Sequence, residues 1–267
     1  MRNQAHDNDP RFVEYYAQQS LSEETIARAD GILRAIMRIR TARGDSVTNL
    51  MVADIGCNAG TQSRRWLEQG HQVRGVDISA DLVELARARN ADFGTRAQFE
   101  IGSATALPWA AGQFDVCLLP ELLEHVDDWQ TCLSEAARVL KPGGSVFLST
   151  TNVLCPVQQE FTLPLYSWYP RKAKEYCVRR ARTDAPQWAN FVTYPAVHWF
   201  SPYQLKAFMS RLGVEALDRF DVMDSRGRGL PVRFALSCIR TVPPLRFFAH
   251  ILTPSTIIIG RKFALPP

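Results

Sequence analysis

Short apolar runs alternate with amphipathic stretches between residues 50 and 152. Each run is apolar on both faces and too short for a buried helix, a pattern typical of parallel strands that helices cover on both sides. The stretches between the runs repeat apolar residues at helical spacing. This alternation predicts an α/β fold with a doubly wound, mostly parallel sheet. The predicted strands are residues 50–55, 72–77, 99–102, 114–119 and 145–151, and the predicted helices between them are 61–69, 79–90 and 129–140.

Two more strands are predicted near the end of the chain, at residues 214–222 and 256–262, which brings the sheet to seven strands. At the other end, the run Ser20-Leu21-Ser22-Glu23 fits a capping box, and we expect a helix from there to about Arg40. Farther upstream, Phe12, Tyr15 and Tyr16 form an aromatic stripe. Such a stripe either closes over a ligand or serves ordinary packing, and packing is the more common role.

A glycine-containing turn follows the first predicted strand, with the spacing Gly56-x-x-x-Gly60. Glycine lets a ligand lie against the backbone at the carboxyl end of a strand. The second strand ends at Asp77, whose carboxylate can accept hydrogen bonds from two ribose hydroxyls. The pattern therefore predicts a site for a nucleoside. Asp54, just before the turn, would repel a pyrophosphate and suits a cationic ligand. A plain strand-turn-helix without a ligand remains the alternative.

The composition is that of an ordinary globular protein of 267 residues, with a net charge of +4. This mild charge does not favour nucleic-acid binding. The amino terminus lacks the apolar core of a signal peptide, and no apolar run approaches the length of a bilayer span, so we expect a cytoplasmic protein. The six cysteines contain no Cys-x-x-Cys pair. They are expected to be reduced and mostly buried, and no metal site is predicted.

Taken together, the motifs of residues 52–152 resemble the class I S-adenosylmethionine-dependent methyltransferases. The matching stretches are 54–60, Asp77, Leu107-Pro108, Phe114-Asp115-Val116 and 140–144. Within that class, the runs 121–126 and 149–152 look most like the ubiquinone-pathway O-methyltransferases and related tailoring enzymes. The resemblance implies a Rossmann-like fold and S-adenosyl-L-methionine as the cofactor.

The resemblance also implies roles for individual residues. Asp54 is expected near the ammonium group of the cofactor, the turn from Gly56 to Gly60 under its methionine and ribose, and Asp77 on the ribose hydroxyls. The full set of predicted cofactor-binding residues is Asp54, Gly56, Cys57, Asn58, Gly60, Asp77, Ile78, Ser103, Ala104, Leu119 and Glu121.

Two positions depart from the family pattern. Many relatives have an aspartate at the position of Ser103, where it holds the adenine amine, and a neutral hydroxyl is a weaker partner. We therefore expect the adenine contact to fall to the backbone of Ala104. Asn58 replaces a glycine, which is a mild change because asparagine tolerates left-handed backbone angles.

Two long insertions interrupt the expected pattern. Residues 153–197 combine aromatic side chains with a basic cluster, which suits a lid over the substrate or a segment on a membrane surface. A partly buried lid with a solvated basic helix is an equal alternative. Residues 227–254 fit two short amphipathic helices separated by Pro243-Pro244. The predicted organisation is a helical cap (1–49), a cofactor-binding half (50–152), the lid (153–197) and a carboxyl-terminal half (198–267).

Two histidines are candidates for the general base. His125 follows the fourth strand, near the carboxyl ends of the strands, whereas His198 comes after the lid. Imidazole has an unperturbed pKa of about 6.5, which suits it to accept a proton from a hydroxyl at neutral pH. Glu121 or Glu124 can orient such a base, and Glu124 is included among the catalytic candidates. A purely structural histidine is the alternative at both positions.

These features predict an enzyme that methylates a hydroxyl of a small or lipid-linked molecule, such as a quinone precursor, a glycolipid sugar or a natural product. The alternative is a protein that binds the cofactor and regulates or scaffolds without catalysis. A nucleic-acid methyltransferase is not favoured, because the base-flipping motif Asn-Pro-Pro-Tyr is absent. Contact with the inner face of a membrane is a further expectation for the insertions.

Overall fold

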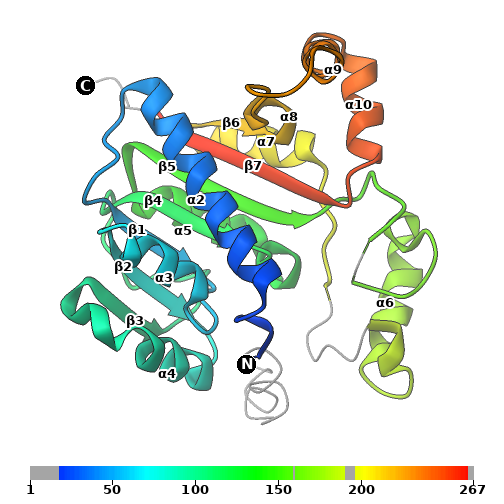
Figure 1. The fold of residues 1–267 in the computed structure, drawn as a ribbon. Helices are drawn as coiled ribbons and strands as arrows, with labels where there is room; N and C mark the ends of the chain where they lie inside the picture. Colours follow the sequence, from blue (N-terminus) through cyan, green and yellow to red (C-terminus); the bar gives the residue numbers. More distant parts are fainter. Residues whose placement is uncertain (1–17, 159, 190–195, 264–267) are drawn as a thin grey trace.

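Seven strands form a single sheet in the computed structural model, which describes residues 18–158, 160–189 and 196–263 (Figure 1). The strand order is β3-β2-β1-β4-β5-β7-β6. Neighbours from β3 to β5 are parallel, and β7 is antiparallel to both β5 and β6. The predicted mostly parallel, seven-stranded sheet is therefore confirmed. The strands are β1 (Met51–Ile55), β2 (Gln72–Asp77), β3 (Ala97–Ile101), β4 (Phe114–Pro120), β5 (Leu140–Thr151), β6 (Val214–Asp218) and β7 (Ser255–Lys262).

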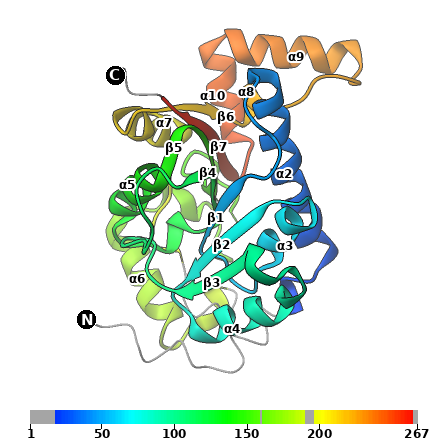
Figure 2. The ribbon, with the colours of Figure 1, turned by 90° about the vertical axis from the view of Figure 1, so that its left-hand side faces the viewer.

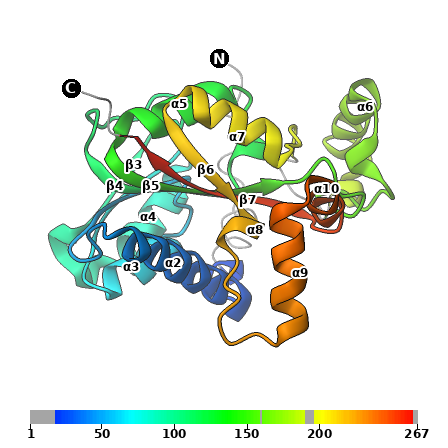
Figure 3. The same ribbon diagram turned by 90° about the horizontal axis from the view of Figure 1, so that it is seen from above.

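Helices cover both faces of the sheet, as Figure 3 shows for α2 and α3 on one face and for α5 and α7 on the other. Shorter 3-10 turns are η1 (Ala91–Arg96), η2 (Leu123–His125), η3 (Tyr166–Trp168) and η4 (Pro186–Ala189). The helices are α2 (Glu23–Arg43), α3 (Thr61–Glu68), α4 (Ala80–Arg89), α5 (Trp129–Val139), α6 (Arg171–Ala181), α7 (Pro202–Arg211), α8 (Arg219–Val222), α9 (Leu230–Thr241) and α10 (Pro243–Ile251).

The hydrophobic core has two layers, one on each face of the sheet. Successive side chains of a strand point to opposite faces, so Val52 joins one layer and Ala53 the other. Trp66 of α3 packs in the layer that contains Val52, and Trp129 of α5 packs in the layer that contains Ala53. This double burial explains why the strands are apolar on both faces, and it holds the carboxyl ends of β1, β2 and β4 in fixed positions.

Three local boundaries differ from the sequence prediction. Helix α2 is capped by Ser22, whose side chain accepts a hydrogen bond from the Thr25 backbone, so the expected cap at Ser20 was wrong by two residues. Strand β6 stops at Asp218, whose side chain caps α8 in a capping box with Asp221. The predicted turn at 141–144 instead belongs to the start of β5, which is offset against β4 by a register shift.

The two insertions form separate helical elements. Figure 1 shows α6 of the first insertion beyond the carboxyl end of β5, and Figure 2 shows α9 and α10 of the second insertion standing at one end of the molecule. The expected pair of short helices in residues 227–254 is confirmed, and the second helix begins at Pro243. Phe12, Tyr15 and Tyr16 lie outside the described residues. Within the described ranges, each helix is either too short or too polar to cross a bilayer.

The cysteines of the described chain are all unpaired, as predicted. Five of them are buried, and Cys238 is partly exposed. Burial raises the pKa of the Cys117 thiol above its usual range and that of Cys132 to about 12. These thiols are therefore protonated packing residues at neutral pH.

Candidate functional site

A cavity of about 480 Å³ opens at the carboxyl ends of β1, β2, β3 and β4. This volume lies within the usual range for small-molecule sites. In a doubly wound sheet, this edge is where ligands bind. Predicted site residues supply about half of the lining: Gly56, Asn58, Asp77, Ile78, Ser103, Ala104, Glu121 and His125.

The turn after β1 brings the backbone close to neighbouring elements. Gly56 and Gly60 have φ angles of +74° and +77°, which L side chains rarely adopt. A Cβ at Gly60 would lie 2.6 Å from the Asn90 side chain, and a Cβ at Gly56 would lie 2.9 Å from a methyl of Leu122. The backbone N–H groups of Gly56 and Cys57 both donate to the Val76 carbonyl. The positive φ angles and these close approaches therefore favour glycine at both positions.

Asp77 lies at the cavity wall with its carboxylate fixed in place. One oxygen accepts a hydrogen bond from the Asn58 N–H at 2.8 Å, and the other accepts from the Ser79 N–H at 3.0 Å. A carboxylate oxygen has two lone pairs and can accept more than one hydrogen bond. The next residue, Ile78, is 63% exposed although its side chain is large and apolar. A flat aromatic ligand in the cavity would cover it.

Asp54 is buried behind the turn and is outside the cavity lining. Its Oδ2 accepts a hydrogen bond from the Ser63 hydroxyl at 2.6 Å, while its Oδ1 is buried without a hydrogen-bond partner. Burial raises the pKa of this carboxyl to about 6. The hydrogen bond from Ser63 lowers the pKa, and the nearby charge of Asp77 raises it. An unpartnered carboxylate oxygen is costly, so a cation near this atom would be strongly stabilised. This observation fits the ammonium group that the sequence placed here.

The segment that follows β4 carries two glutamates with different environments. Glu121 lines the cavity, has a left-handed backbone (φ +50°) and accepts a hydrogen bond from the Ser149 hydroxyl. Glu124 is fully buried and accepts from the Thr150 hydroxyl at 2.8 Å. Burial, and then the charge of Glu121, holds the pKa of Glu124 well above its usual range. This environment disfavours the charged form of Glu124.

Glu124 lies outside the cavity lining. Its backbone carbonyl accepts hydrogen bonds from the N–H groups of Val197 and His198. Its position makes it a residue that holds the 121–126 segment against the stretch after the first insertion. Leu119, also predicted as a cofactor contact, is fully buried in the core, and Cys57 is buried against Val83 and Phe99. Their positions in the sequence did not show that these residues are buried and do not line the cavity.

The two candidate histidines lie close to the same short segment, residues 125–127. His125 is exposed and lines the cavity. His198 lies beside the cavity, where its Nε2 is 3.1 Å from the carbonyl oxygen of Asp127, a residue of the cavity lining. Because a carbonyl only accepts hydrogen bonds, this Nε2 carries the proton, and Nδ1 of a neutral His198 is unprotonated. Both rings are therefore placed near the same rim of the cavity.

Ser103 points its hydroxyl into its own turn. The Ser103 oxygen accepts a hydrogen bond from the Thr105 N–H at 3.2 Å and lies 2.8 Å from the Thr105 hydroxyl. Ser103, Ala104 and Thr105 all line the cavity. The local hydrogen bonds compete with any contact from this hydroxyl to a ligand. The backbone of Ala104 therefore remains the expected partner for an adenine edge.

Several lining residues were missed by the sequence. Ser79 and Leu82 begin the helix after Asp77, and Leu122 covers Gly56 from the β4 side. The helix-cap position of Ser79 was visible in the sequence, but nothing indicated that it faces a ligand. Leu122 and Asp127 reach the cavity only because β4 lies beside β1 in the sheet.

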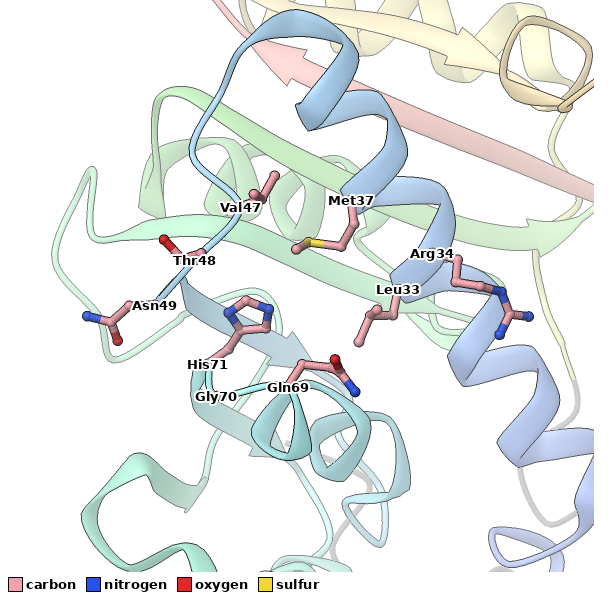
Figure 4. Close-up of a pocket in the computed structure, with 9 residues that line it drawn as sticks. All are labelled: Leu33, Arg34, Met37, Val47, Thr48, Asn49, Gln69, Gly70 and His71. Carbon is pink, nitrogen blue, oxygen red and sulfur yellow. The ribbon is translucent and has the colours of Figure 1, made fainter. Parts of the chain in front are cut away.

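A second cavity, of about 570 Å³, lies at the opposite edge of the sheet (Figure 4). It is found beside the amino ends of β1 and β2, between α2 and the end of α3, and it contains no predicted site residue. His71 is part of its wall and accepts a hydrogen bond on Nδ1 from the Leu50 N–H. Burial lowers the pKa of His71, so the ring is neutral. The functional site is assigned to the cavity at the carboxyl edge.

The comparisons with known proteins agree with this placement. Residues 53–148 match the family model described as "Methyltransferase domain". A ubiquinone biosynthesis O-methyltransferase of Xanthomonas axonopodis is 37% identical over 102 residues, which cover 38% of this chain and 43% of that protein. The enzyme of the same name from Thiobacillus denitrificans is 35% identical over 132 residues, which cover 47% and 56%. The chain thus spans about half the length of these curated relatives.

Solved structures share the fold over most of the chain. An S-adenosylmethionine-dependent methyltransferase from Mesorhizobium loti has a TM-score of 0.56 at 18% identity, with 85% of this chain and 98% of that chain covered. The phosphoethanolamine N-methyltransferase 2 of Haemonchus contortus, solved with S-adenosyl-L-methionine, has a TM-score of 0.54 at 17% identity, with 95% and 60% covered. The [4+2]-cyclase SpnF has a TM-score of 0.54 at 18% identity, with 90% and 82% covered. At these identities, the likeness establishes the fold.

Proposed function

We propose that this chain, which carries a methyltransferase domain of the class I S-adenosylmethionine-dependent type, transfers a methyl group from that cofactor to a hydroxyl of a small or lipid-linked acceptor. The observation that carries the proposal is a pair of carboxylates, one at the cavity wall and one buried behind the turn that borders the cavity. Asp77 is fixed at the wall by two backbone N–H groups, and Asp54 has one buried oxygen without a partner. A ribose and an ammonium group satisfy these two carboxylates, respectively.

The residues of the cavity fit the cofactor part by part. Asp77 would accept hydrogen bonds from the ribose hydroxyls, and the backbone at Gly56 would lie beside the ribose and methionine. The exposed side chain of Ile78 would pack against the adenine ring, and the Ala104 backbone would bind the adenine edge. Asp54, buried behind the turn, would attract the ammonium group.

The cofactor supplies a methyl group on a positively charged sulfur, which is already activated for displacement. The chain therefore has to align the acceptor oxygen and remove its proton. We propose His125, which lines the cavity, as the residue that takes that proton. His198 is the second candidate, because its Nδ1 is unprotonated when the ring is neutral. Glu124, which is buried, contributes by holding the segment that carries His125.

A hydroxyl acceptor is supported by the names of the curated relatives, which are O-methyltransferases. The family model ends at residue 148, so the segment after β5 lies outside it. We propose that this segment contributes to the choice of acceptor. We propose a phenol or an alcohol on a small or lipid-linked molecule as the substrate class.

One observation favours a second candidate, a cofactor-binding protein without transfer activity. The Ser103 hydroxyl is engaged by Thr105, so the adenine contact is weaker than in the family pattern. The structural neighbour SpnF is described as a cyclase, so the name of a neighbour with this fold need not be that of a methyltransferase. This candidate predicts cofactor binding with no methylated product on any acceptor.

The test is a screen of acceptors with methyl-labelled S-adenosylmethionine, read out by mass spectrometry of the products. The panel contains phenols, sugar alcohols, lipid-linked quinone precursors and amines, and Asp77→Ala serves as the matched negative control. We expect label on a hydroxyl-bearing acceptor, and much less label with Asp77→Ala when the cofactor concentration is below saturation. Label on amines alone would overturn the hydroxyl assignment. Binding without transfer to any class would favour the second candidate.

A further inference from the structure

Helices α9 and α10 expose large apolar side chains that a water-soluble surface normally covers. Leu230 and Phe234 of α9, with Phe248 of α10 and Leu252 just after it, are between 62% and 81% exposed. The spacing of four between Leu230 and Phe234 places them on one face of α9, and Phe248 and Leu252 share a face in the same way. Patches of this kind mark contact sites for a partner or a membrane.

Helices α9 and α10 form a hairpin that is firmly attached to the rest of the protein. Arg240 donates hydrogen bonds to the carbonyls of Phe220 and Met223, and Arg246 is paired with Asp218 at its base. Asn152, at the end of β5, donates to the carbonyls of His250 and Thr253. Figure 3 shows α9 projecting beside α2 at the edge of the molecule. The exposed apolar side chains of α9 and α10 are thus carried on a hairpin that is anchored at its base.

The charge of the same segment has a single sign. Residues 227–254 contain the four arginines Arg228, Arg233, Arg240 and Arg246, and no aspartate or glutamate. Arg228 and Arg233 are exposed, and in the described part of the chain neither has a carboxylate within ion-pair distance. Apolar side chains beside unpaired arginines match the interface of an anionic bilayer, where acyl chains lie next to phosphate groups.

We propose that the outer face of α9 and α10 binds the surface of an anionic lipid bilayer. A second copy of this chain fits less well, because pairing two such faces would bring their arginines together at the contact. Lipid phosphates instead neutralise the arginines while the acyl region covers Phe234 and Phe248. The inference does not depend on the reaction catalysed at the cavity.

The first insertion is a weaker candidate for the same role. Several of its aromatic side chains are packed, with Phe161 stacked on Tyr166 at 4.1 Å and Tyr166 against Trp199, just after the insertion, at 5.2 Å. Part of its basic charge is paired, between Arg171 and Glu175 and between Arg180 and Asp184. The α9–α10 hairpin is therefore the segment we choose for the proposal.

The hairpin also has a useful position relative to the site. Its end leads into β7, where Ser255 pairs with Thr151 at the carboxyl end of β5. The cavity opens at the carboxyl ends of the neighbouring strands. A membrane-bound hairpin thus keeps the cavity edge of the sheet near the lipid surface.

Sedimentation with vesicles tests the proposal on the full-length protein. Vesicles of phosphatidylcholine alone are compared with vesicles that contain phosphatidylglycerol, at about 0.05 M and about 0.5 M salt. We expect binding to the anionic vesicles that falls at least about tenfold at high salt. Equal binding to both compositions, or none to either, would overturn the proposal.

Variants assign the binding to the hairpin. The double variants Phe234→Ser/Phe248→Ser and Arg228→Gln/Arg233→Gln should each lower partition to anionic vesicles by about tenfold or more. The matched control, Val157→Ser/Tyr176→Ser in the first insertion, should leave it unchanged. Thermal unfolding verifies that each variant is folded. Loss of binding only in the control variant would refute the assignment to α9 and α10, as would a stable dimer that Phe234→Ser/Phe248→Ser abolishes without any vesicle binding.

Discussion

The backbone N–H of Asn58 donates a hydrogen bond of 2.8 Å to Oδ2 of Asp77, which joins the turn after β1 to the end of β2. Asn58 has a φ angle of +49°, which an asparagine tolerates, and this conformation turns its N–H toward the carboxylate. The two halves of the proposed ribose site are therefore fixed to each other before a ligand binds. Such preorganisation lowers the cost of binding.

Replacing Asp77 should weaken cofactor binding more than it weakens the fold. Asp77→Ala removes a charge-assisted contact to two hydroxyls, and we expect a loss of about 1.5 to 3 kcal/mol in binding free energy. Asp77→Asn keeps the size of the side chain and should lose less. Calorimetric titration of S-adenosylhomocysteine measures both, with thermal unfolding as the control for folding. Unchanged affinity in Asp77→Ala would remove this residue from the site.

A substitution at Ser103 is predicted to increase the affinity for the cofactor. Ser103→Asp restores a carboxylate at the cavity wall, which can accept a hydrogen bond from the adenine amine, and a charge-assisted hydrogen bond is worth about 1.5 to 3 kcal/mol. We expect tighter binding of S-adenosylhomocysteine. Ser103→Ala is the matched control and should change affinity little, because the native hydroxyl is engaged by Thr105. A weaker complex with Ser103→Asp would show that adenine lies elsewhere.

The raised pKa of Asp54 predicts a pH-dependent stability. The unfolded carboxyl ionises near its ordinary pKa of 3.8, whereas the folded one ionises at about 6. Between these values the folded state binds more protons, so Asp54 lowers the stability of the ligand-free protein as pH rises from about 4 to about 6. Above about pH 6 the loss in free energy of unfolding caused by Asp54 is constant, at roughly 2–3 kcal/mol.

Asp54→Asn removes this titration while keeping an acceptor for Ser63. The free energy of unfolding of the variant, relative to the wild type, should therefore be higher at pH 7 than at pH 4 by roughly 2–3 kcal/mol. The same variant should bind the cofactor more weakly, because the ammonium partner is lost. Urea unfolding at the two pH values measures the first effect. A difference that does not change with pH would contradict the assigned pKa.

His125 is the predicted base. His125→Ala should bind the cofactor normally but lose at least about a hundredfold in turnover on an aliphatic hydroxyl. The loss should be smaller on an acidic phenol, whose proton leaves more easily. His198→Ala is measured in parallel. Near-full turnover of His125→Ala from pH 6 to 9 would shift the role to His198 or to alignment alone.

The fold was predictable because the sequence patterns that specify its strands, turns and helices are local. Apolar runs, the glycines at 56 and 60, and the helix caps at Ser79 and Ser201 each belong to one short segment, and the structure has them in the expected places. Even the errors were local. Ser22 and Ser20 are equally good caps by residue type, and the structure uses Ser22, whose hydroxyl reaches the Thr25 N–H.

The site was only partly predictable because it is assembled from segments that are far apart in the chain. Nothing near Asp54 in sequence indicated that Ser63 would satisfy one of its oxygens and leave the other without a partner. The contact between His198 and the Asp127 carbonyl joins residues 71 positions apart. Glu124 and His125 are adjacent in sequence, but Glu124 is buried against Thr150 and His125 lines the cavity, a difference that depends on segments distant in the chain.

The central claim is that the cavity at the carboxyl edge binds S-adenosylmethionine, and direct calorimetric titration tests it. The cofactor and its product S-adenosylhomocysteine are titrated into the wild-type protein, with NAD as the matched dinucleotide. We predict saturable 1:1 binding of both, with a dissociation constant between about 1 µM and 1 mM, and no binding of NAD, whose pyrophosphate the Asp54 carboxylate repels. Binding of NAD in preference to S-adenosylhomocysteine, or no binding of either, would contradict the account.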